Sequence, residues 1–429
     1  MNADTIFALS SGQPPAAIAI VRLSGPAAAS ALETLAGLLP VPRTASLRTI
    51  AHPATGEPLD RAILLFFPGP DSATGEDIAE LHLHGGRSVV AAVLDALGSI
   101  NGLRSAQPGE FTRRAFENGR MDLAEAEGLA DLLAAETQSQ RRAALALAGG
   151  ALSRRVEAWQ DRLLQLAAAV ESLLDFSDEG DVGDELPTSW TAALGSLTVE
   201  LDQLLRSPPA ERLRDGIRVV IAGPPNAGKS SLLNWLAGRR AAITSAIAGT
   251  TRDLIEAPTA IGGAPFLLVD TAGLREGADA IEAEGVSLAR ASMAAADLIL
   301  WLGDPHDCPD PARSILVASK ADLYPEPRRP LADIHVSAET GEGMDALIAL
   351  MVDRGRALLP REGEVAVNAR HRAALADCVC HLHSAANSTD LLIVSESLRL
   401  ARASLDRITG RAGVEDMLDR LFSSFCIGK

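Results

Sequence analysis

The sequence predicts an α+β domain at the N-terminus and a helical domain that is interrupted by an inserted α/β domain with a doubly wound, mainly parallel sheet. Three observations predict this fold class. Residues 1–118 mix strand-like and helix-like runs, residues 215–360 alternate strand, loop and helix, and residues 119–214 and 361–429 are helical on either side of that alternation. We therefore expect the two helical stretches to form one domain around the insertion.

The composition is that of a globular chain with several domains. A length of 429 residues corresponds to about three domains of roughly 150 residues. Hydrophobic residues make up 47% and charged residues 22%, which excludes a disordered chain. The formal net charge is −17, so the chain as a whole does not have the basic surface of a general nucleic-acid binder. Any RNA contact must therefore come from a local patch or a partner.

The N-terminus and the cysteines indicate a cytoplasmic protein. Met1 to Asp4 carry no basic cluster of a signal peptide, and no apolar run approaches the roughly 18 residues that span a bilayer. Four cysteines are too few for a disulfide scaffold in a chain of this length. We expect no membrane segment.

In the N-terminal domain, residues 1–118, apolar runs that end at Gly or Pro predict strands. They lie at Ala17–Gly25, Ile63–Pro70 and Ala79–Gly86, and a helix pattern follows at Ser88–Leu97. Strands and helices in one short segment are typical of an α+β domain.

The helical domain is predicted in two parts. The pattern is helical from Met121 to about Phe176 and again from Asn368 onward, whereas the acidic stretch Asp175–Pro187 reads as a loop. Between the two parts the inserted domain ends near Leu359, because Pro360 cannot continue a helix. Its evenly spaced βα units predict a parallel sheet, with strands in RVVIAG, FLLVDTAG, LILWLGD, SILVASK and DIHVSAE.

The first strand of the inserted domain leads into a phosphate-binding motif. Gly223–Ser230 reads GPPNAGKS and fits G-x4-G-K-[ST] between a strand and a helix. Backbone N–H groups of such a loop wrap phosphates at a helix N-terminus. Lys229 is expected to reach the β- and γ-phosphates, and Ser230 to ligate magnesium. Lys229 is one of three lysines among 39 basic residues, which favours a site that requires the compact ammonium.

Two segments are expected around the magnesium ion and the γ-phosphate. In GTTRD, Thr251 can complete the magnesium shell when a γ-phosphate is present. In DTAG, Asp270 supports the magnesium ion indirectly and Gly273 is positioned to sense the γ-phosphate.

Two later segments are expected to bind guanine. In SKAD, the Asp322 carboxylate can accept hydrogen bonds from guanine N1–H and the 2-amino group. Backbone donors of SAE, Ser337–Glu339, suit the guanine carbonyl. These segments, in this order within one α/β domain, predict a GTPase.

The usual water-orienting glutamine is absent, because Leu274 follows DTAG. The Asn226 amide oxygen can instead bind a monovalent cation, together with carbonyls of Ser245 and Ile247, in place of an arginine finger. Asn226 is alternatively a residue that only forms the loop. Glu282 can hold the water, although an isolated glutamate on a helix surface is usually inert.

At this point the residues resemble a known family. GPPNAGKSSLLN, AIAGTTRD, DTAGLRE, PGEFTRRAF and the terminal FSSFCIGK are together similar to the MnmE (TrmE) family of tRNA modification GTPases. The resemblance runs from DTIFAL near Asp4 to Lys429. The GTPase motifs are shared with Era-like GTPases, whereas the N-terminal motifs and CIGK are far more specific.

The resemblance implies a potassium-activated GTPase that dimerises through its N-terminal domain. With a flavoprotein partner, MnmG, it forms the 5-carboxymethylaminomethyl or aminomethyl group on the wobble uridine of tRNA. The implied cofactors are GTP or GDP, magnesium, potassium and 5-formyl-tetrahydrofolate or a related folate.

The resemblance also assigns residues. Folate contacts fall on Arg22, Glu80, Arg120 and Lys429. Magnesium ligands fall on Ser230 and Thr251, and potassium ligands on Asn226, Ser245, Ile247 and Thr250. The catalytic glutamate falls on Glu282 and the family cysteine on Cys426. The full set expected around the nucleotide is Asn226, Ala227, Gly228, Lys229, Ser230, Ser231, Ser245, Ala246, Ile247, Ala248, Gly249, Thr250, Thr251, Asp270, Thr271, Ala272, Gly273, Ser319, Lys320, Ala321, Asp322, Ser337, Ala338 and Glu339.

Two positions depart from the family pattern. The usual [NT]KxD reads SKAD, with Ser319 at its first position, and the basic residue at the folate site is Arg120. Two other functions stay open: an Era-like regulatory GTPase that acts in ribosome assembly without chemistry on RNA, and a folate-dependent one-carbon transferase with an appended switch. The acidic composition and the C-terminal cysteine argue against the first.

Overall fold

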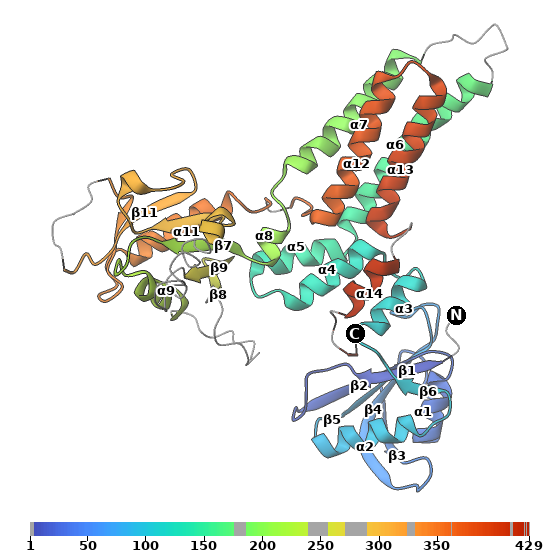
Figure 1. Ribbon diagram of the computed structural model, residues 1–429. Helices are drawn as coiled ribbons and strands as arrows, with labels where there is room; N and C mark the ends of the chain where they lie inside the picture. The colour runs from blue at the N-terminus through green and yellow to red at the C-terminus, as the bar shows by residue number, and fades with distance from the viewer. Residues whose placement is uncertain are drawn as a thin grey trace, which may run out of the picture. The chain divides into compact units, whose positions relative to one another are not determined.

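The computed structural model describes residues 4–175, 186–238, 256–270, 290–323, 331–361, 363–411, 415–423, 425 and 427–428. The chain divides into two compact units. Unit 1 combines Met1–Ala130 with Asp406–Lys429, and unit 2 is Asp131–Leu405. Figure 1 labels the elements of both.

Unit 1 is built on a mixed six-stranded sheet with the order β3-β4-β5-β2-β1-β6. All pairs are antiparallel except β1 with β6. The predicted strands appear as β2 (Ile18–Ser24), β4 (Pro58–Phe67) and β5 (Ile78–His84), and the predicted helix as α2 (Arg87–Gly98). The remaining elements are β1 (Thr5–Leu9), α1 (Ala28–Ala36), β3 (Ser46–Ala51) and β6 (Leu103–Ser105).

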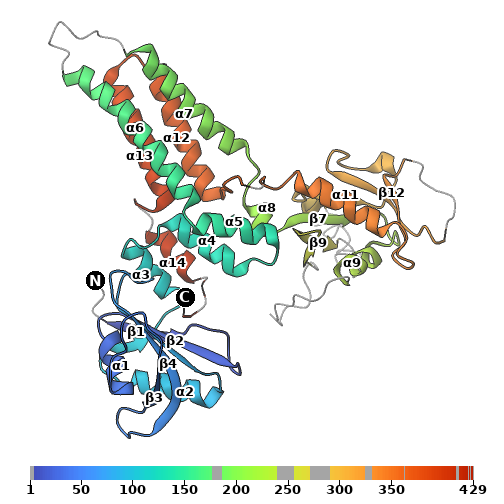
Figure 2. The same ribbon diagram turned by 180° about the vertical axis from the view of Figure 1, so that it is seen from behind.

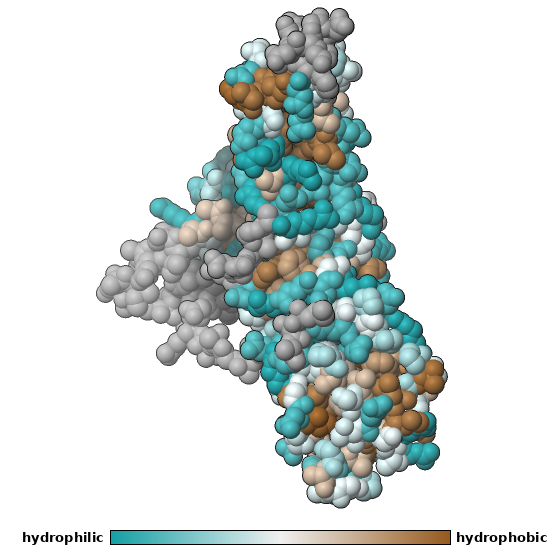
Figure 3. Space-filling view, turned by 90° about the vertical axis from the view of Figure 1, so that its right-hand side faces the viewer, coloured by the Kyte–Doolittle hydropathy of each residue, from teal (hydrophilic) through white to brown (hydrophobic). Residues whose placement is uncertain are grey.

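One face of this sheet is covered and the other is open. Alternate residues of a strand point to opposite faces. Val21 and Leu23 of β2 are buried in one core with Leu32 of α1 and Val93 of α2. The intervening residues of β2 lie on the other face, where Ile18 is 60% exposed. Figure 3 shows apolar residues on the surface of this unit, at the lower end of the view.

The C-terminal end of the chain belongs to unit 1. There α3 (Glu110–Glu117), the start of α4 (Leu123–Ala134) and α14 (Glu415–Ser423) pack together. Leu123, Phe422 and Phe425 form the buried cluster, and the rings of Phe422 and Phe425 lie 6.2 Å apart. Apolar burial therefore joins the last residues of the chain to the N-terminal ones.

The helices of unit 2 come from both sides of the insertion. They are α5 (Gln138–Ala148), α6 (Ala151–Asp175), α7 (Thr188–Arg206), α12 (Ala369–Asn387) and α13 (Leu391–Thr409). Both ribbon views show α7 beside α12, and the two helices are in contact (Figures 1 and 2). Helices before and after the α/β domain thus form one bundle, as expected for an insertion. The predicted loop at 176–185 lies outside the described residues.

The inserted domain is a six-stranded sheet with the order β12-β11-β10-β7-β9-β8. Its strands are β7 (Ile217–Ala222), β8 (Glu256–Ile261), β9 (Ala264–Asp270), β10 (Leu298–Trp301), β11 (Ser314–Ala318) and β12 (Ile334–His335). Its helices include α9 (Lys229–Gly238) and α11 (Met344–Arg356), and a short 3-10 turn, η2, spans Pro305–Asp307. The short helix α8 (Glu211–Arg214) directly precedes the domain. The sheet is mainly parallel, as predicted.

The antiparallel strand β8 is set by its turn. Gly262 and Gly263 join β8 to β9 with φ of +58° and +81°. Positive φ at both residues is the geometry of a two-residue hairpin turn, which glycine adopts without steric cost. This hairpin was not among the predicted strands. Among the described residues, no helix is both long and apolar enough to cross a membrane.

Candidate functional site

The phosphate-binding loop runs from the end of β7 to the first turn of α9. Its backbone enters the left-handed region at Asn226 (φ +59°) and at Gly228 (φ +91°). Asparagine and glycine are the residues that tolerate this region best, so both residue types fit the loop's shape. The loop brings the N-terminus of α9, a favourable place for phosphate, to the end of the sheet.

Lys229 is folded onto this loop. Its Nζ donates hydrogen bonds to the carbonyl oxygens of Gly223 at 3.1 Å and Pro224 at 2.9 Å, and the residue is buried. A buried ammonium is stabilised by such carbonyl acceptors. The charge therefore stands at the mouth of the loop, where a phosphate oxygen can take over one of these bonds.

Two of the three residues expected near magnesium, Ser230 and Asp270, are in direct contact. Asp270 ends β9, which pairs with β7, and Ser230 follows Lys229 on α9. Ser230 Oγ donates to Asp270 Oδ2 at 2.8 Å. A hydroxyl and a carboxylate are oxygen ligands of the kind that magnesium prefers, so the pair fits this ion.

The SKAD segment is tied to the phosphate-binding loop. Ser319 Oγ donates to the Ala227 carbonyl oxygen at 2.5 Å, and Lys320 Nζ donates to the Asn226 carbonyl oxygen at 2.8 Å. Ala321 N–H donates to the Val336 carbonyl oxygen at 3.1 Å, which places the SAE segment next to SKAD. Ser337 is fully buried.

A cavity of about 630 Å³ opens between these segments. This volume lies within the range of sites that take a nucleotide-sized ligand. The predicted residues that line it are Gly228, Ser231, Ser319, Lys320, Asp322, Ala338 and Glu339, whereas the polar residue Asn234 was not predicted.

The cavity also contains residues that the motifs did not identify. Trp235 and Leu323 line it, among other residues. Trp235 lies four residues after Ser231 on α9, and Leu323 directly follows Asp322. Residues four apart on a helix share a face, so this spacing from Ser231 could have identified Trp235.

Several predicted residues lie outside the described part of the chain. They are Ser245, Ala246, Ile247, Ala248, Gly249, Thr250, Thr251, Thr271, Ala272, Gly273, Glu282, Cys426 and Lys429.

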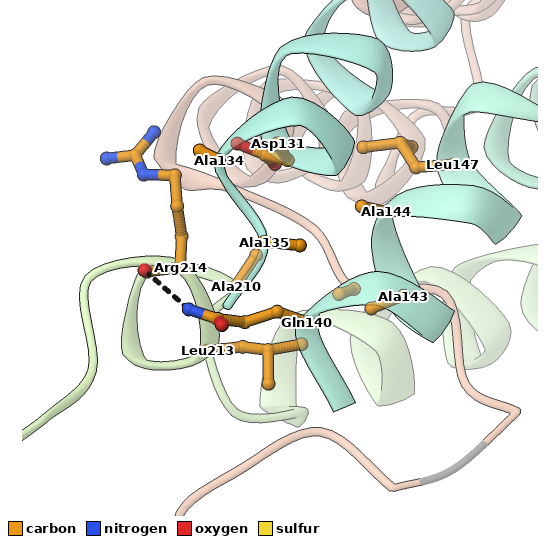
Figure 4. Close-up of a pocket in the computed structure, with 11 residues that line it drawn as sticks. Asp131, Ala134, Ala135, Gln140, Ala143, Ala144, Leu147, Ala210, Leu213 and Arg214 are labelled. Carbon is orange, nitrogen blue, oxygen red and sulfur yellow. Dashed lines mark hydrogen bonds between the residues drawn. The ribbon is translucent and has the colours of Figure 1, made fainter. Parts of the chain in front are cut away.

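A second cavity, between the α4–α5 region and α8, measures about 40 Å³ (Figure 4). Its walls are mostly alanine, and Gln140 Nε2 donates to the Arg214 carbonyl oxygen across one side at 3.1 Å. This volume suits about one water molecule and no substrate. It is a junction between helices.

In unit 1 the pair Arg22 and Glu80 lies on the open face of the sheet. The two residues are register partners on β2 and β5, and Glu80 Oε1 accepts from Arg22 Nε at 3.0 Å and Nη2 at 2.8 Å. Glu80 Oε2 lies 3.1 Å from His82 Nε2. Burial raises the pKa of Glu80, but the hydrogen bond of His82 and the charge of Arg22 outweigh it and hold the pKa below its usual range. Glu80 is thus an oriented, ionised acceptor. Its contact with His82 was not predicted from the sequence.

Arg120 lies on the chain after α3 and faces a different partner. Arg120 Nη1 is 3.8 Å from Asp71 Oδ1, at the start of the loop that continues to Glu76. Asn118 Nδ2 donates to the Thr74 carbonyl oxygen of the same loop at 2.8 Å. Ser24, two residues after Arg22, donates to Glu76 Oε2 at 2.7 Å. The loop thus connects Arg120 to the strand that carries Arg22.

The last described residues of the chain contact β1, the strand that pairs with β2 on the side opposite β5. Ile427 forms an antiparallel bridge with Pro108. Gly428 lies against Leu9 at the end of β1, and Leu9 is the register partner of Val21. Gly428 therefore contacts β1 at the residue pair next to the pair of Ala8 with Arg22.

The comparisons with known proteins cover the whole chain. Residues 5–120 match a family model described as the GTP-binding protein TrmE N-terminus, and residues 123–426 match one described as the MnmE helical domain. A tRNA modification GTPase MnmE of Rhizorhabdus wittichii is 60% identical over 99% of this chain and 97% of that protein. Relatives of the same name from Erythrobacter litoralis and Novosphingobium aromaticivorans are each 55% identical over 99% of this chain and 100% of their own lengths. The chain belongs to the MnmE family of tRNA modification GTPases.

Proposed function

We propose that this GTPase is activated by potassium and, with a flavoprotein of the MnmG type, forms the 5-carboxymethylaminomethyl or aminomethyl group on the wobble uridine of tRNA. A tetrahydrofolate, such as the 5-formyl derivative, supplies or mimics the one-carbon unit. The observation that carries the proposal is the occurrence, in one chain, of the Lys229–Ser230–Asp270 phosphate site and of the Arg22–Glu80 pair, with Gly428 against the neighbouring strand β1.

The proposed nucleotide site uses the residues named above. Asp322 selects guanine, and Lys229 neutralises charge on the transferred phosphoryl group. Ser230 and Thr251 would hold magnesium, which would supply positive charge against the phosphates. Asn226, Ser245, Ile247 and Thr250 hold potassium, and Glu282 orients the water.

The proposed folate site fits the chemistry of Glu80. An ionised carboxylate with both oxygens oriented by hydrogen bonds accepts well from the ring N–H and amino groups of a pterin. Arg22, Arg120 and Lys429 supply positive charge for the carboxylates of the ligand. Cys426 provides a thiol for the reaction.

The proposed assembly is a homodimer in the cytoplasm, which binds tRNA and the flavoprotein. The open sheet face of unit 1, with Ile18, Leu47 and Ile63 exposed, supports pairing through the N-terminal domain. We propose domain boundaries of 1–118 for the folate-binding and dimerisation domain, 119–214 and 361–429 for the helical domain, and 215–360 for the GTPase domain.

Mass spectrometry of tRNA nucleosides from a deletion strain tests the proposal. We expect the modified wobble uridine to disappear and to return when the gene is restored. Normal nucleosides with an accumulation of ribosome precursors would favour the Era-like regulatory function instead. If both the nucleosides and the ribosomes are normal, the remaining candidate function is the folate-dependent one-carbon transferase.

A further inference from the structure

We propose that Gly109 and Gly428 are positioning residues for the tRNA-modifying reaction, because they seat the C-terminal segment against the N-terminal sheet beside Arg22 and Glu80. The C-terminal segment is defined here by its described residues, 415–423, 425 and 427–428. This inference rests on the one-carbon site proposed above and adds the device that assembles it.

Gly109 forms the first contact of the seat. It precedes α3 with φ +68°, and a Cβ at this position would lie 2.3 Å from the carbonyl oxygen of Phe422 and 2.9 Å from the Phe422 Cα. The obstructing atoms are backbone atoms, which cannot rotate away as a side chain can. Any residue larger than glycine must therefore push the end of α14 outward.

Gly428 forms the second contact. Its φ is +97°, and a Cβ there would lie 2.1 Å from the Leu9 carbonyl oxygen and 3.0 Å from the Ser10 Cα. The preceding residue, Ile427, is bridged to Pro108, one residue before Gly109. The C-terminal segment thus makes close backbone contacts at Phe422 and at Gly428, a geometry that glycine alone permits.

Between the two glycines the segment is anchored by apolar burial. Phe422 and Phe425 are buried with Leu123, and Phe425 N–H donates to the Phe422 carbonyl oxygen at 3.1 Å. Burial of Phe422 and Phe425 holds the segment on unit 1, whereas the two glycines determine how closely its backbone approaches α3 and β1.

The contact of Gly428 with β1 lies close to Arg22 along the sheet, which links it to the proposed one-carbon site. Leu9, which Gly428 touches, pairs with Val21, and Ala8 pairs with Arg22. Ser10 N–H donates to the Ile20 carbonyl oxygen at 2.7 Å, so the contact strand is continuous with β2. A displaced end would move Ile427 and Gly428 relative to the strand that carries Arg22.

Gly109→Ala and Gly428→Ala test this seat, with Gly37→Ala and Gly56→Ala as matched controls. The control glycines have φ of +76° and +72° in the same unit, but an added Cβ meets nothing within 4 Å. All four variants therefore carry the left-handed strain, and only the first two add a backbone clash.

We expect Gly109→Ala and Gly428→Ala to weaken binding of 5-formyl-tetrahydrofolate at least about tenfold in calorimetry, while both controls bind like wild type. Hydrogen exchange of the peptide spanning residues 415–429 should accelerate in these two variants alone. GTP turnover should stay at the wild-type value in all four variants. The left-handed strain lowers the midpoint of thermal unfolding in the controls as well, so a loss of stability alone would weaken folate binding in the controls too.

The positioning role of the two glycines and the proposed one-carbon site can be refuted separately. If wild type binds folate and both clash variants bind equally well with unchanged exchange, the seat has no positioning role. If wild type does not bind folate, the one-carbon site is wrong, and the seat is then judged by modified nucleosides in complemented deletion cells. Gly428 is the penultimate residue, so its variant remains informative even if Gly109→Ala fails to fold.

Discussion

At the scale of single residues, Asn226 has two physical roles that can be separated. Its backbone lies at φ +59°, which asparagine tolerates, and its amide oxygen is the proposed potassium ligand. We predict faster GTP turnover in potassium chloride than in sodium chloride at equal ionic strength. Asn226→Gly preserves the backbone geometry and removes only the amide, so it should abolish the potassium effect while GTP binding persists. Equal rates of the wild type in both salts would refute the cation site.

Ser319 is a second residue whose effect follows from its donors. Its one hydroxyl proton is already donated to the Ala227 carbonyl oxygen, so none is left for the base. Asparagine has two amide protons and can make both bonds. One neutral hydrogen bond is worth roughly 0.5–1.5 kcal/mol, so Ser319→Asn should bind a fluorescent GDP analogue about two- to twelvefold more tightly.

The control for this prediction is Ser319→Ala, which loses the bond to the Ala227 carbonyl oxygen and should bind more weakly than wild type. Guanine specificity should persist in both variants because Asp322 is unchanged. Unchanged or weaker GDP binding by Ser319→Asn would show that the serine costs no affinity.

The residues around Lys229 and in the neighbouring cavity could be located from the sequence because each motif is contiguous and carries its own loop geometry. The pairing of Arg22 with Glu80 could not be predicted in this way, since the two are 58 residues apart and meet only through strand register. Only the family resemblance named both. Neither approach identified His82 as a partner of Glu80, or the contact of Gly109 with Phe422.

At the scale of elements, α3 is fixed to the sheet by a buried arginine. Arg114 is 1% exposed and pairs with Asp4 at 2.9 Å, Glu76 at 3.0 Å and Glu110 at 3.3 Å. Removing one partner of a buried ion pair leaves uncompensated charge, which typically costs about 3–5 kcal/mol. We therefore predict that Arg114→Met lowers the free energy of unfolding by about that amount in urea denaturation.

Its matched control is Arg113→Met on the same helix, where the pairs with Glu117 and Asp419 are exposed. Exposed pairs contribute about 0–1 kcal/mol, so this variant should be nearly neutral. Equal losses for the two variants would mean that burial of Arg114 does not matter.

Elements with a continuous apolar run were predicted well, and those without one were not. The strands β2, β7 and β11 are mainly apolar, and their positions agree with prediction within a few residues. By contrast, β8 contains Pro258 and owes its strand form to pairing with β9 through the Gly262–Gly263 turn. Such strands are stabilised by pairing with another strand, and the residues of the strand alone do not reveal that pairing.

At the scale of the whole molecule, the chain carries two sites that we assign to one reaction. Glu282→Ala should slow GTP hydrolysis by about 10²-fold or more with little change in GTP affinity, since a water-positioning group acts mainly in the transition state. A parallel loss of affinity would show instead that Glu282 holds the nucleotide.

Cys426→Ser should abolish wobble-uridine modification and leave GTP hydrolysis intact, because the thiol lies outside every nucleotide motif. The readouts are nucleoside analysis of tRNA from complemented cells and phosphate release by the purified variant. Persistence of the modified nucleoside would remove Cys426 from the chemistry.

The most direct test of the central claim is nucleoside mass spectrometry of tRNA from a deletion strain that carries wild type, Glu80→Ala or Glu282→Ala. If the N-terminal site and the GTPase site serve one reaction, wild type restores the modified wobble uridine and both variants fail, although Glu80→Ala still hydrolyses GTP. Full modification with either variant would contradict the account.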